Sequence, residues 1–162
     1  RQMCIRDSLM DVSDDIPEPA TLTHLKDNFT NSCWGQRTTT MVELPFDVSL
    51  GSVVINGRID AVFQDDDDHY TVVDWKTGKV PTNEKDRMTK ALQLAVYRIA
   101  FQRIINVQRA EKGQPPLPLE NIRAAFYYVA HDDTLWLDEL ADAAELEKLI
   151  TGLTASTDME KQ

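Results

Sequence analysis

Apolar and polar residues alternate with two different periods along this chain, and these periods predict helices and strands in a definite order. Leu22, Leu25 and Phe29 recur at helical spacing and predict a helix over residues 20–32. Three apolar runs of strand length follow, separated first by a glycine and then by a run of aspartates. These runs predict strands over residues 38–50, 52–63 and 70–76.

A long helix is predicted next, because a capping residue marks its start and glycine and proline residues follow its end. Thr82 or Asn83 is able to cap its first turn, and the helical pattern continues to Gln108 or Arg109. The segment Gly-Gln-Pro-Pro-Leu-Pro at residues 113–118 then excludes any continuation of the helix. Beyond it, the pattern predicts strands over residues 122–130 and 134–137 and a last helix over residues 139–150.

This order of elements predicts an α/β fold, in which a central mixed β-sheet is flanked by helices. With 162 residues the chain is long enough for one domain with its own core. Residues 1–16 show no periodicity and are expected to be a disordered or non-native leader. The folded domain is therefore expected over residues 17–152, followed by a polar tail over 153–162.

Composition indicates a globular protein that does not enter a membrane. Hydrophobic residues make up 42% and charged residues 27% of the chain. No apolar run approaches the roughly 20 residues of a membrane span, and the first residues lack the apolar block of a secretory signal. Cys4 and Cys33 are too few for a disulfide framework. We therefore expect a cytoplasmic location.

The charge balance argues against tight unaided binding to nucleic acid. The chain carries 27 acidic and 17 basic residues, a net charge of −10, whereas DNA-binding proteins usually present a basic surface. Part of the acidic excess lies in the aspartate run at residues 65–68. The bases concentrate in a later segment, at Lys76, Lys79, Lys85, Arg87, Lys90 and Arg98.

Three residues from two neighbouring strands form the best candidate site. Asp74 and Lys76 share one face of their strand, because strand side chains alternate with a period of two. A hairpin between this strand and the preceding one would bring Asp60 to the same place. Two carboxylates bind a hard divalent cation, and a nearby lysine orients water or neutralises phosphate charge. The alternative is a solvated hairpin-end aspartate and a surface ion pair.

These residues belong to an ordered set of motifs that resembles the PD-(D/E)xK nucleases, specifically their RecB-like branch. The set comprises Gly-Arg-Ile-Asp at residues 57–60, Asp-Trp-Lys at 74–76, and Gln-Leu-Ala-Val-Tyr at 93–97. The resemblance spans roughly residues 20–150 and implies a restriction-endonuclease-like core. Domains of this branch often lie at the C-terminus of UvrD-like helicases, which implies a helicase motor domain in the same or an associated chain.

The resemblance also implies roles for individual residues. Asp60, Asp74 and the backbone carbonyl of Trp75 would bind Mg²⁺ or Mn²⁺, and Lys76 would hold the attacking water. Gln93 would orient that water or the phosphate, and Tyr97 would contact the DNA backbone. Three bases would contact DNA, namely Lys79, Lys90 and Arg98.

An acid, a histidine and the number of cysteines are also compared with the pattern of this family. For Glu43 two interpretations remain open. One is an accessory or second-metal role, and the other is an ordinary charged residue of a strand. His24 lies in a predicted helix, where RecB-like domains carry a metal-binding histidine, but the surrounding pattern favours a surface position. Some relatives hold an iron–sulfur cluster with four cysteines, and two cysteines exclude such a cluster within this chain.

The function expected from these residues is metal-dependent cleavage of DNA, of exonuclease type, within a DNA-repair helicase–nuclease. One alternative is a non-cleaving DNA-binding or docking module of a repair complex. A second alternative is a free-standing endonuclease with a sequence preference, which the acidic balance disfavours.

Overall fold

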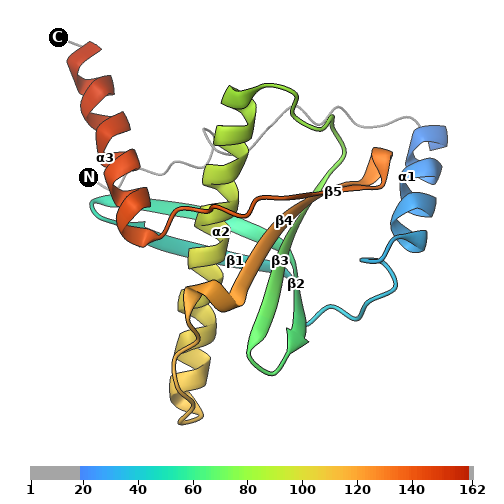
Figure 1. Ribbon diagram of the computed structural model, residues 1–162, viewed down its shortest axis with the longest axis horizontal. Coiled ribbons are helices and arrows are strands. Elements are labelled where there is room, and N and C mark those ends of the chain that lie inside the picture. The colour runs from blue at the N-terminus through green and yellow to red at the C-terminus, as the bar shows by residue number, and fades with distance from the viewer. Residues whose placement is uncertain (1–18, 161–162) are drawn as a thin grey trace.

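The computed structural model describes residues 19–160, with side chains over residues 21–152, and is shown in Figure 1. The leader expected at residues 1–16, with Cys4, and the last two residues of the expected tail lie outside this part. The elements are α1 (Pro19–Asn31), β1 (Met41–Leu50), β2 (Val53–Asp66), β3 (His69–Lys76), α2 (Glu84–Glu111), β4 (Ile122–Tyr128), β5 (Asp133–Trp136) and α3 (Ala143–Glu160). Two short 3-10 turns, Leu119–Asn121 and Val129–His131, flank β4.

The strands form one five-stranded sheet in the order β1-β2-β3-β4-β5. Neighbouring strands are antiparallel except β3 and β4, which run parallel and are joined by α2. A parallel pair needs such a crossover, because a short turn cannot return the chain to the starting edge. The predicted α/β class with a central mixed sheet flanked by helices is confirmed.

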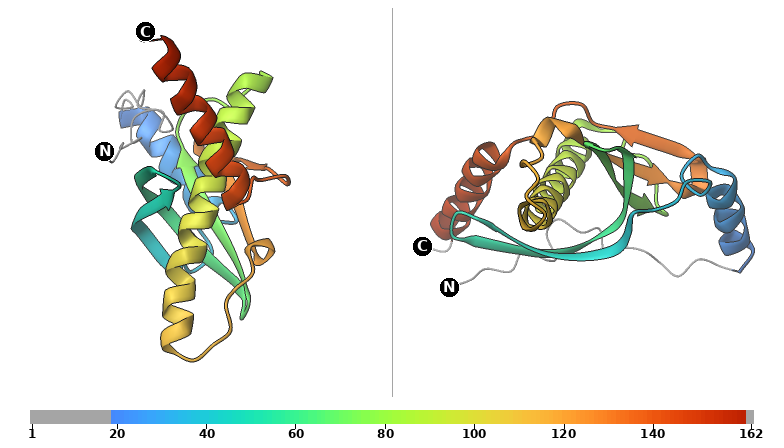
Figure 2. Two further views of the ribbon diagram at one scale, coloured as in Figure 1. Left: turned by 90° about the vertical axis from the view of Figure 1, so that its left-hand side faces the viewer. Right: turned by 90° about the horizontal axis from the view of Figure 1, so that it is seen from below.

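The two faces of the sheet carry separate apolar clusters, and the sheet curves around α2 in Figure 2. Val72 of β3 packs with Leu94 and Phe101 of α2. Val73, the next residue, belongs to the opposite cluster with Leu25 of α1. By the same alternation Asp74 and Lys76 face the side that α2 covers, which agrees with the predicted common face.

The start of β1 and the ends of β2 and α2 differ by a few residues from the predicted boundaries. β2 continues to Asp66, so the turn is reduced to residues 67–68. This extension is favoured because Asp65 accepts hydrogen bonds from Thr71 Oγ1 at 2.6 Å and from Arg37 at 2.9 Å. Asn83, one of the two predicted caps of α2, accepts the N–H of Asp86 at 2.8 Å.

The last helix was predicted wrongly at both ends. It begins at Ala143 because the Asp142 carboxylate accepts the N–H of Glu145 at 2.8 Å and so caps its first turn. It continues to Glu160, through most of the expected polar tail. Leu146 is buried, and Glu147 accepts the N–H of Gly51 at 2.7 Å, so α3 is held against the turn between β1 and β2. Among the described residues, no helix combines the length and the apolarity that crossing a membrane requires.

Candidate active site

The hairpin of β2 and β3 brings Asp60 and Asp74 together, as predicted. Ala61 pairs with Val73, so the two aspartates occupy facing positions on adjacent strands. Asp60 Oδ2 accepts the backbone N–H of Trp75 at 2.8 Å, which fixes this carboxylate against β3. Asp74 is buried, with 5% of its surface exposed, while Asp60 is half-buried. The pair therefore lies at the boundary of the core, where the Asp74 carboxylate is buried and the Asp60 carboxylate is partly exposed.

Lys76 completes this cluster as an ion-pair partner. Its Nζ lies 3.0 Å from Asp74 Oδ2, and its side chain is 16% exposed. The same ammonium lies 5.3 Å from the centre of the Phe126 ring, within range of a cation–π attraction. Lys76 is thus the cationic partner of Asp74 Oδ2. That oxygen keeps a free acceptor position.

The environment of Asp74 favours its protonated form when no cation is bound. Burial raises the pKa of Asp74 from its usual 3.8 to about 7. The charge of Lys76 acts in the opposite direction, and the neighbouring Asp60 adds to the rise. Two adjacent carboxylates in a desolvated place repel each other, so a bound cation would relieve this repulsion.

A pH dependence of stability follows for the metal-free protein. The pKa of Asp74 is higher in the folded than in the unfolded chain, so its contribution is fully present below about pH 4 and is lost as the pH rises through about 7. Asp74→Asn is expected to remove most of this loss. At pH 8 in chelator, we expect the variant to be more stable than wild type by on the order of a few kcal/mol.

Calorimetry between pH 4 and 8 measures this effect. Asp67→Asn serves as the control, because Asp67 lies in the exposed turn between β2 and β3. An Asp74→Asn variant with the same pH dependence as wild type would assign the destabilising charge to another group.

Gln93 and Tyr97 share one face of α2, as their spacing predicts, and Tyr97 lies close enough to Asp74 and Asp60 to feel their charges. Both side chains are 2% exposed, and Gln93 Nε2 donates to the Tyr97 hydroxyl at 3.0 Å. Burial raises the pKa of Tyr97 far above its usual range, and the charges of Asp74 and Asp60 raise it further. Tyr97 thus remains a protonated phenol close to the carboxylates. Because Tyr97 is buried, its hydroxyl is not on the surface that a DNA backbone would contact. Its hydrogen bond with Gln93 suits it instead to holding the Gln93 amide in place.

The donor set fits a hard divalent cation. The buried Gln93 Oε1 has no hydrogen-bond partner among the described residues, and Asp74 Oδ2 has the Lys76 ammonium at 3.0 Å. Buried oxygens without a donor are uncommon, and a cation with its water shell would satisfy them. No group of three or more His, Cys, Asp or Glu is gathered in the described part of the chain. Mg²⁺ suits such a site, because it is often held by one or two carboxylates and keeps several waters.

The predicted DNA-contacting bases do not all lie at the carboxylates. Lys90 of α2 has its Nζ 5.9 Å from the same Phe126 ring that Lys76 contacts. Lys79 is exposed in the loop that follows β3. Arg98 instead has Asp142 and Glu120 as its charged neighbours, and burial lowers its pKa. Lys90 therefore lies beside Lys76 and Lys79 is exposed in the next loop, whereas Arg98 has acidic neighbours from other segments.

The two accessory residues take different positions. Glu43 lies opposite Asp60, between the ladder pairs Val42 with Ala61 and Leu44 with Ile59. His24 is exposed on α1, and its ring nitrogen lies 3.4 Å from Asn28 Nδ2.

Helix α1 packs on the sheet face opposite Asp74, since Phe29 contacts Trp75 with ring centres 5.1 Å apart. The structure thus brings Glu43, but not His24, to the edge of the site.

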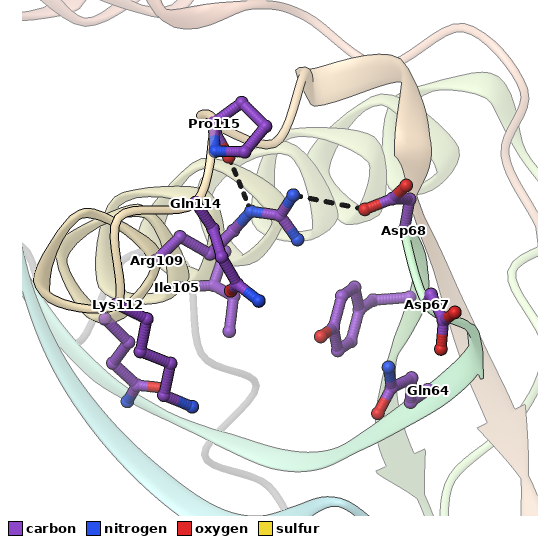
Figure 3. A pocket seen from close by; sticks show the side chains of 10 residues that line it. Gln64, Asp67, Asp68, Ile105, Arg109, Lys112, Gln114 and Pro115 are labelled. Atoms are coloured by element: carbon purple, nitrogen blue, oxygen red, sulfur yellow. Dashed lines mark hydrogen bonds and ion pairs between the residues drawn. The ribbon is translucent and has the colours of Figure 1, made fainter.

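A cavity of about 530 Å³ lies at the other end of the sheet, between the β2–β3 turn and the end of α2 (Figure 3). Arg109 crosses it, donating to the Pro115 carbonyl at 2.7 Å and to Asp68 at 3.1 Å. None of the residues predicted for catalysis lines this cavity. Arg109 and Asp68, two of its charged groups, pair with each other, and we place the chemistry at Asp60 and Asp74.

Comparisons with known proteins agree with the motifs. The family model of the PD-(D/E)XK nuclease superfamily matches residues 18–159. No curated protein matches the chain. Ten chains of solved structures match, among them the structure described as "Crystal structure of SSO0001", with 18% sequence identity and a TM-score of 0.44. That match covers 82% of this chain and 56% of the other.

Proposed function

The chain belongs to the PD-(D/E)XK nuclease superfamily, and from this premise we propose that it is a Mg²⁺- or Mn²⁺-dependent deoxyribonuclease of the RecB-like branch. The observation that carries the proposal is the buried cluster of Asp60, Asp74 and Lys76. Its carboxylates face each other across β2 and β3, and Lys76 Nζ lies 3.0 Å from Asp74 Oδ2. A buried charged cluster of this kind costs desolvation free energy, which a catalytic role explains.

The cation would be held by Asp60, Asp74 and the Trp75 carbonyl, and would supply a Lewis acid that lowers the pKa of water and offsets charge on the phosphate. Asp60 is kept in place for this by the N–H of Trp75. Gln93 Oε1 accepts a hydrogen bond from the attacking water and so orients it toward phosphorus. Tyr97, bonded to the Gln93 amide, holds that amide in one orientation.

Lys76 acts on the charge that develops during hydrolysis. Its ammonium donates to the attacking water or to a non-bridging phosphate oxygen, and it stays in place because Asp74 and the Phe126 ring both attract it. A preorganised charge in a site with little water stabilises the transition state more than the same charge in solution. The products are a 3′ hydroxyl and a 5′ phosphate if the 3′ oxygen leaves.

We further propose that this domain works as the nuclease part of a DNA-repair or recombination helicase–nuclease, with exonuclease activity. The support is electrostatic. A net charge of −10 opposes binding to a polyanion, and the basic rim offers few phosphate contacts. A UvrD-like motor that feeds DNA into the site would replace affinity by a high effective concentration.

The isolated protein is therefore expected to cleave DNA slowly with Mn²⁺ or Mg²⁺, and to bind it weakly. Labelled single- and double-stranded DNA is incubated with each cation and, separately, with chelator. Binding is measured with Ca²⁺, at low and at physiological salt. We expect metal-dependent cleavage, and binding that is largely lost at physiological salt.

Each alternative predicts a different result in the same experiment. A non-cleaving module would bind DNA without cutting it under any of these cations. A free-standing endonuclease would bind tightly at physiological salt, which would refute the dependence on a motor.

A further inference from the structure

The ring of Phe126 lies beside Asp74, although the two residues are far apart in the sequence. Phe126 is the direct partner of Asp74 in the parallel ladder between β3 and β4 (Figure 1). Partners in a ladder send their side chains to the same face of the sheet, so the ring is next to the buried carboxylate. Phe126 is fully buried and packs in the cluster on the α2 side, with Leu94. The ring is therefore a part of the site that the core holds rigidly.

Two ammonium groups from different elements lie over this one ring. Nζ of Lys76 is 5.3 Å and Nζ of Lys90 is 5.9 Å from its centre. Lys76 ends β3, whereas Lys90 belongs to α2 and precedes Gln93 by three residues, on the same face of the helix. The face of an aromatic ring attracts a cation most strongly where water is excluded. The side chain of Lys76, which is 16% exposed, meets this condition.

The charges of this group of residues indicate how many phosphates the site accepts. In their ionised forms, Asp60 and Asp74 balance Lys76 and Lys90. A divalent cation held by the two carboxylates adds two positive charges, and the balance is then lost. Two phosphodiester groups would restore it, because each carries one negative charge. The surplus therefore matches the scissile phosphate and one neighbouring phosphate.

We propose that Phe126 positions both ammonium groups, so that Lys76 meets the scissile phosphate while Lys90 binds the next phosphate of the same strand. This inference rests on the proposed nuclease function and extends it to a second phosphate contact in the same site. Phe126 is a positioning residue, since it acts through two lysines and does not touch the substrate. A lysine side chain has many rotamers, and a fixed ring that favours one of them reduces the entropy lost when phosphate binds.

Lys90→Ala tests the second phosphate contact on the complete chain. With a labelled oligonucleotide and Mn²⁺, we expect KM to rise about tenfold and kcat to change far less, because the lost contact is not with the reacting phosphate. With Ca²⁺, the slope of log affinity against log salt should fall by about 0.7–0.9, the loss of one phosphate contact. Lys112→Ala is the matched control, an exposed lysine at the other end of α2.

Fluorinated phenylalanine in place of Phe126 tests the ring while it keeps nearly the same size and remains apolar. Fluorine withdraws electron density from the ring face, so one, two and three fluorines weaken its attraction for an ammonium step by step. We expect kcat/KM to fall with each step, by about 3-fold to 30-fold at three fluorines. The same series at Phe63 is the matched control. Phe63 is also fully buried and has the Arg37 guanidinium 4.8 Å from its ring centre, but it belongs to the opposite cluster.

A combination of both changes shows whether the ring acts through Lys90. In the Lys90→Ala background, the fluorinated ring should still lower kcat through Lys76. The further rise in KM should be absent, because the second ammonium group is no longer there.

The possible results distinguish this inference from the proposed function. Wild-type kinetics in the fluorinated Phe126 series overturn the inference even where Phe126→Leu loses activity, because the ring then serves only packing. Equal losses in the Phe63 series overturn it as well, since the effect is then not specific to the site. An unchanged KM and salt slope in Lys90→Ala remove the second phosphate contact. Each of these results leaves the nuclease assignment in place, whereas a wild-type protein that neither binds nor cleaves the oligonucleotide contradicts both.

Discussion

Asp74→Asn and Lys76→Ala are each expected to lower kcat for DNA cleavage by at least about 10²- to 10³-fold. Asp74→Asn removes the charge of a carboxylate that we propose to hold the cation. Lys76→Ala removes the ammonium that lies 3.0 Å from it. Because both groups act on the same reacting phosphate, the double variant should be little worse than either single variant. Single-turnover cleavage with Mn²⁺ at saturating protein measures the chemical step.

The two substitutions differ in their effect on folding, which the assay must take into account. Asp74→Asn leaves a neutral side chain of the same shape. Lys76→Ala leaves a buried carboxylate without its counter-charge, which is destabilising unless that carboxylate takes up a proton. Lys112→Ala, an exposed lysine near the end of α2, is the matched control and should cleave like wild type. Wild-type rates in both site variants would remove Asp74 and Lys76 from the mechanism.

Divalent cations are expected to raise the thermal stability of the protein through the same carboxylates. A cation that binds only the folded state stabilises it by about 2.7 kcal/mol at a hundredfold excess over its dissociation constant. Calorimetry with Mg²⁺, with Mn²⁺ and with chelator measures the shift. The response should disappear in Asp60→Asn/Asp74→Asn, because this variant removes both carboxylate charges and their repulsion.

The aspartate run at the β2–β3 turn is the obvious competing site for a cation. Asp67→Asn/Asp68→Asn therefore serves as the control variant and should keep the full response. An equal response in Asp60→Asn/Asp74→Asn, combined with its loss in the turn variant, would place the cation at the turn.

The sequence by itself determined the elements and the parts of the site that depend on local periodicity. Asp74 and Lys76 share a face because a strand has a period of two. Gln93 and Tyr97 share a face because they are four residues apart on a helix. The facing of Asp60 and Asp74 followed from a hairpin between consecutive strands. The boundaries of α3 did not follow, since several acids near its start are able to cap a helix and only Asp142 does so.

Only the tertiary structure decided which of these groups are buried, and which neighbours from distant segments surround them. Arg98 belongs to the same basic segment of the sequence as Lys79 and Lys90, yet its charged neighbours are Asp142 and Glu120. Tyr97 is 2% exposed, because α2 lies directly against the sheet. The pKa of Asp74 is raised to about 7 by burial under that helix. Solvation and long-range contacts sum over segments far apart in the chain, so no local pattern of residues contains them.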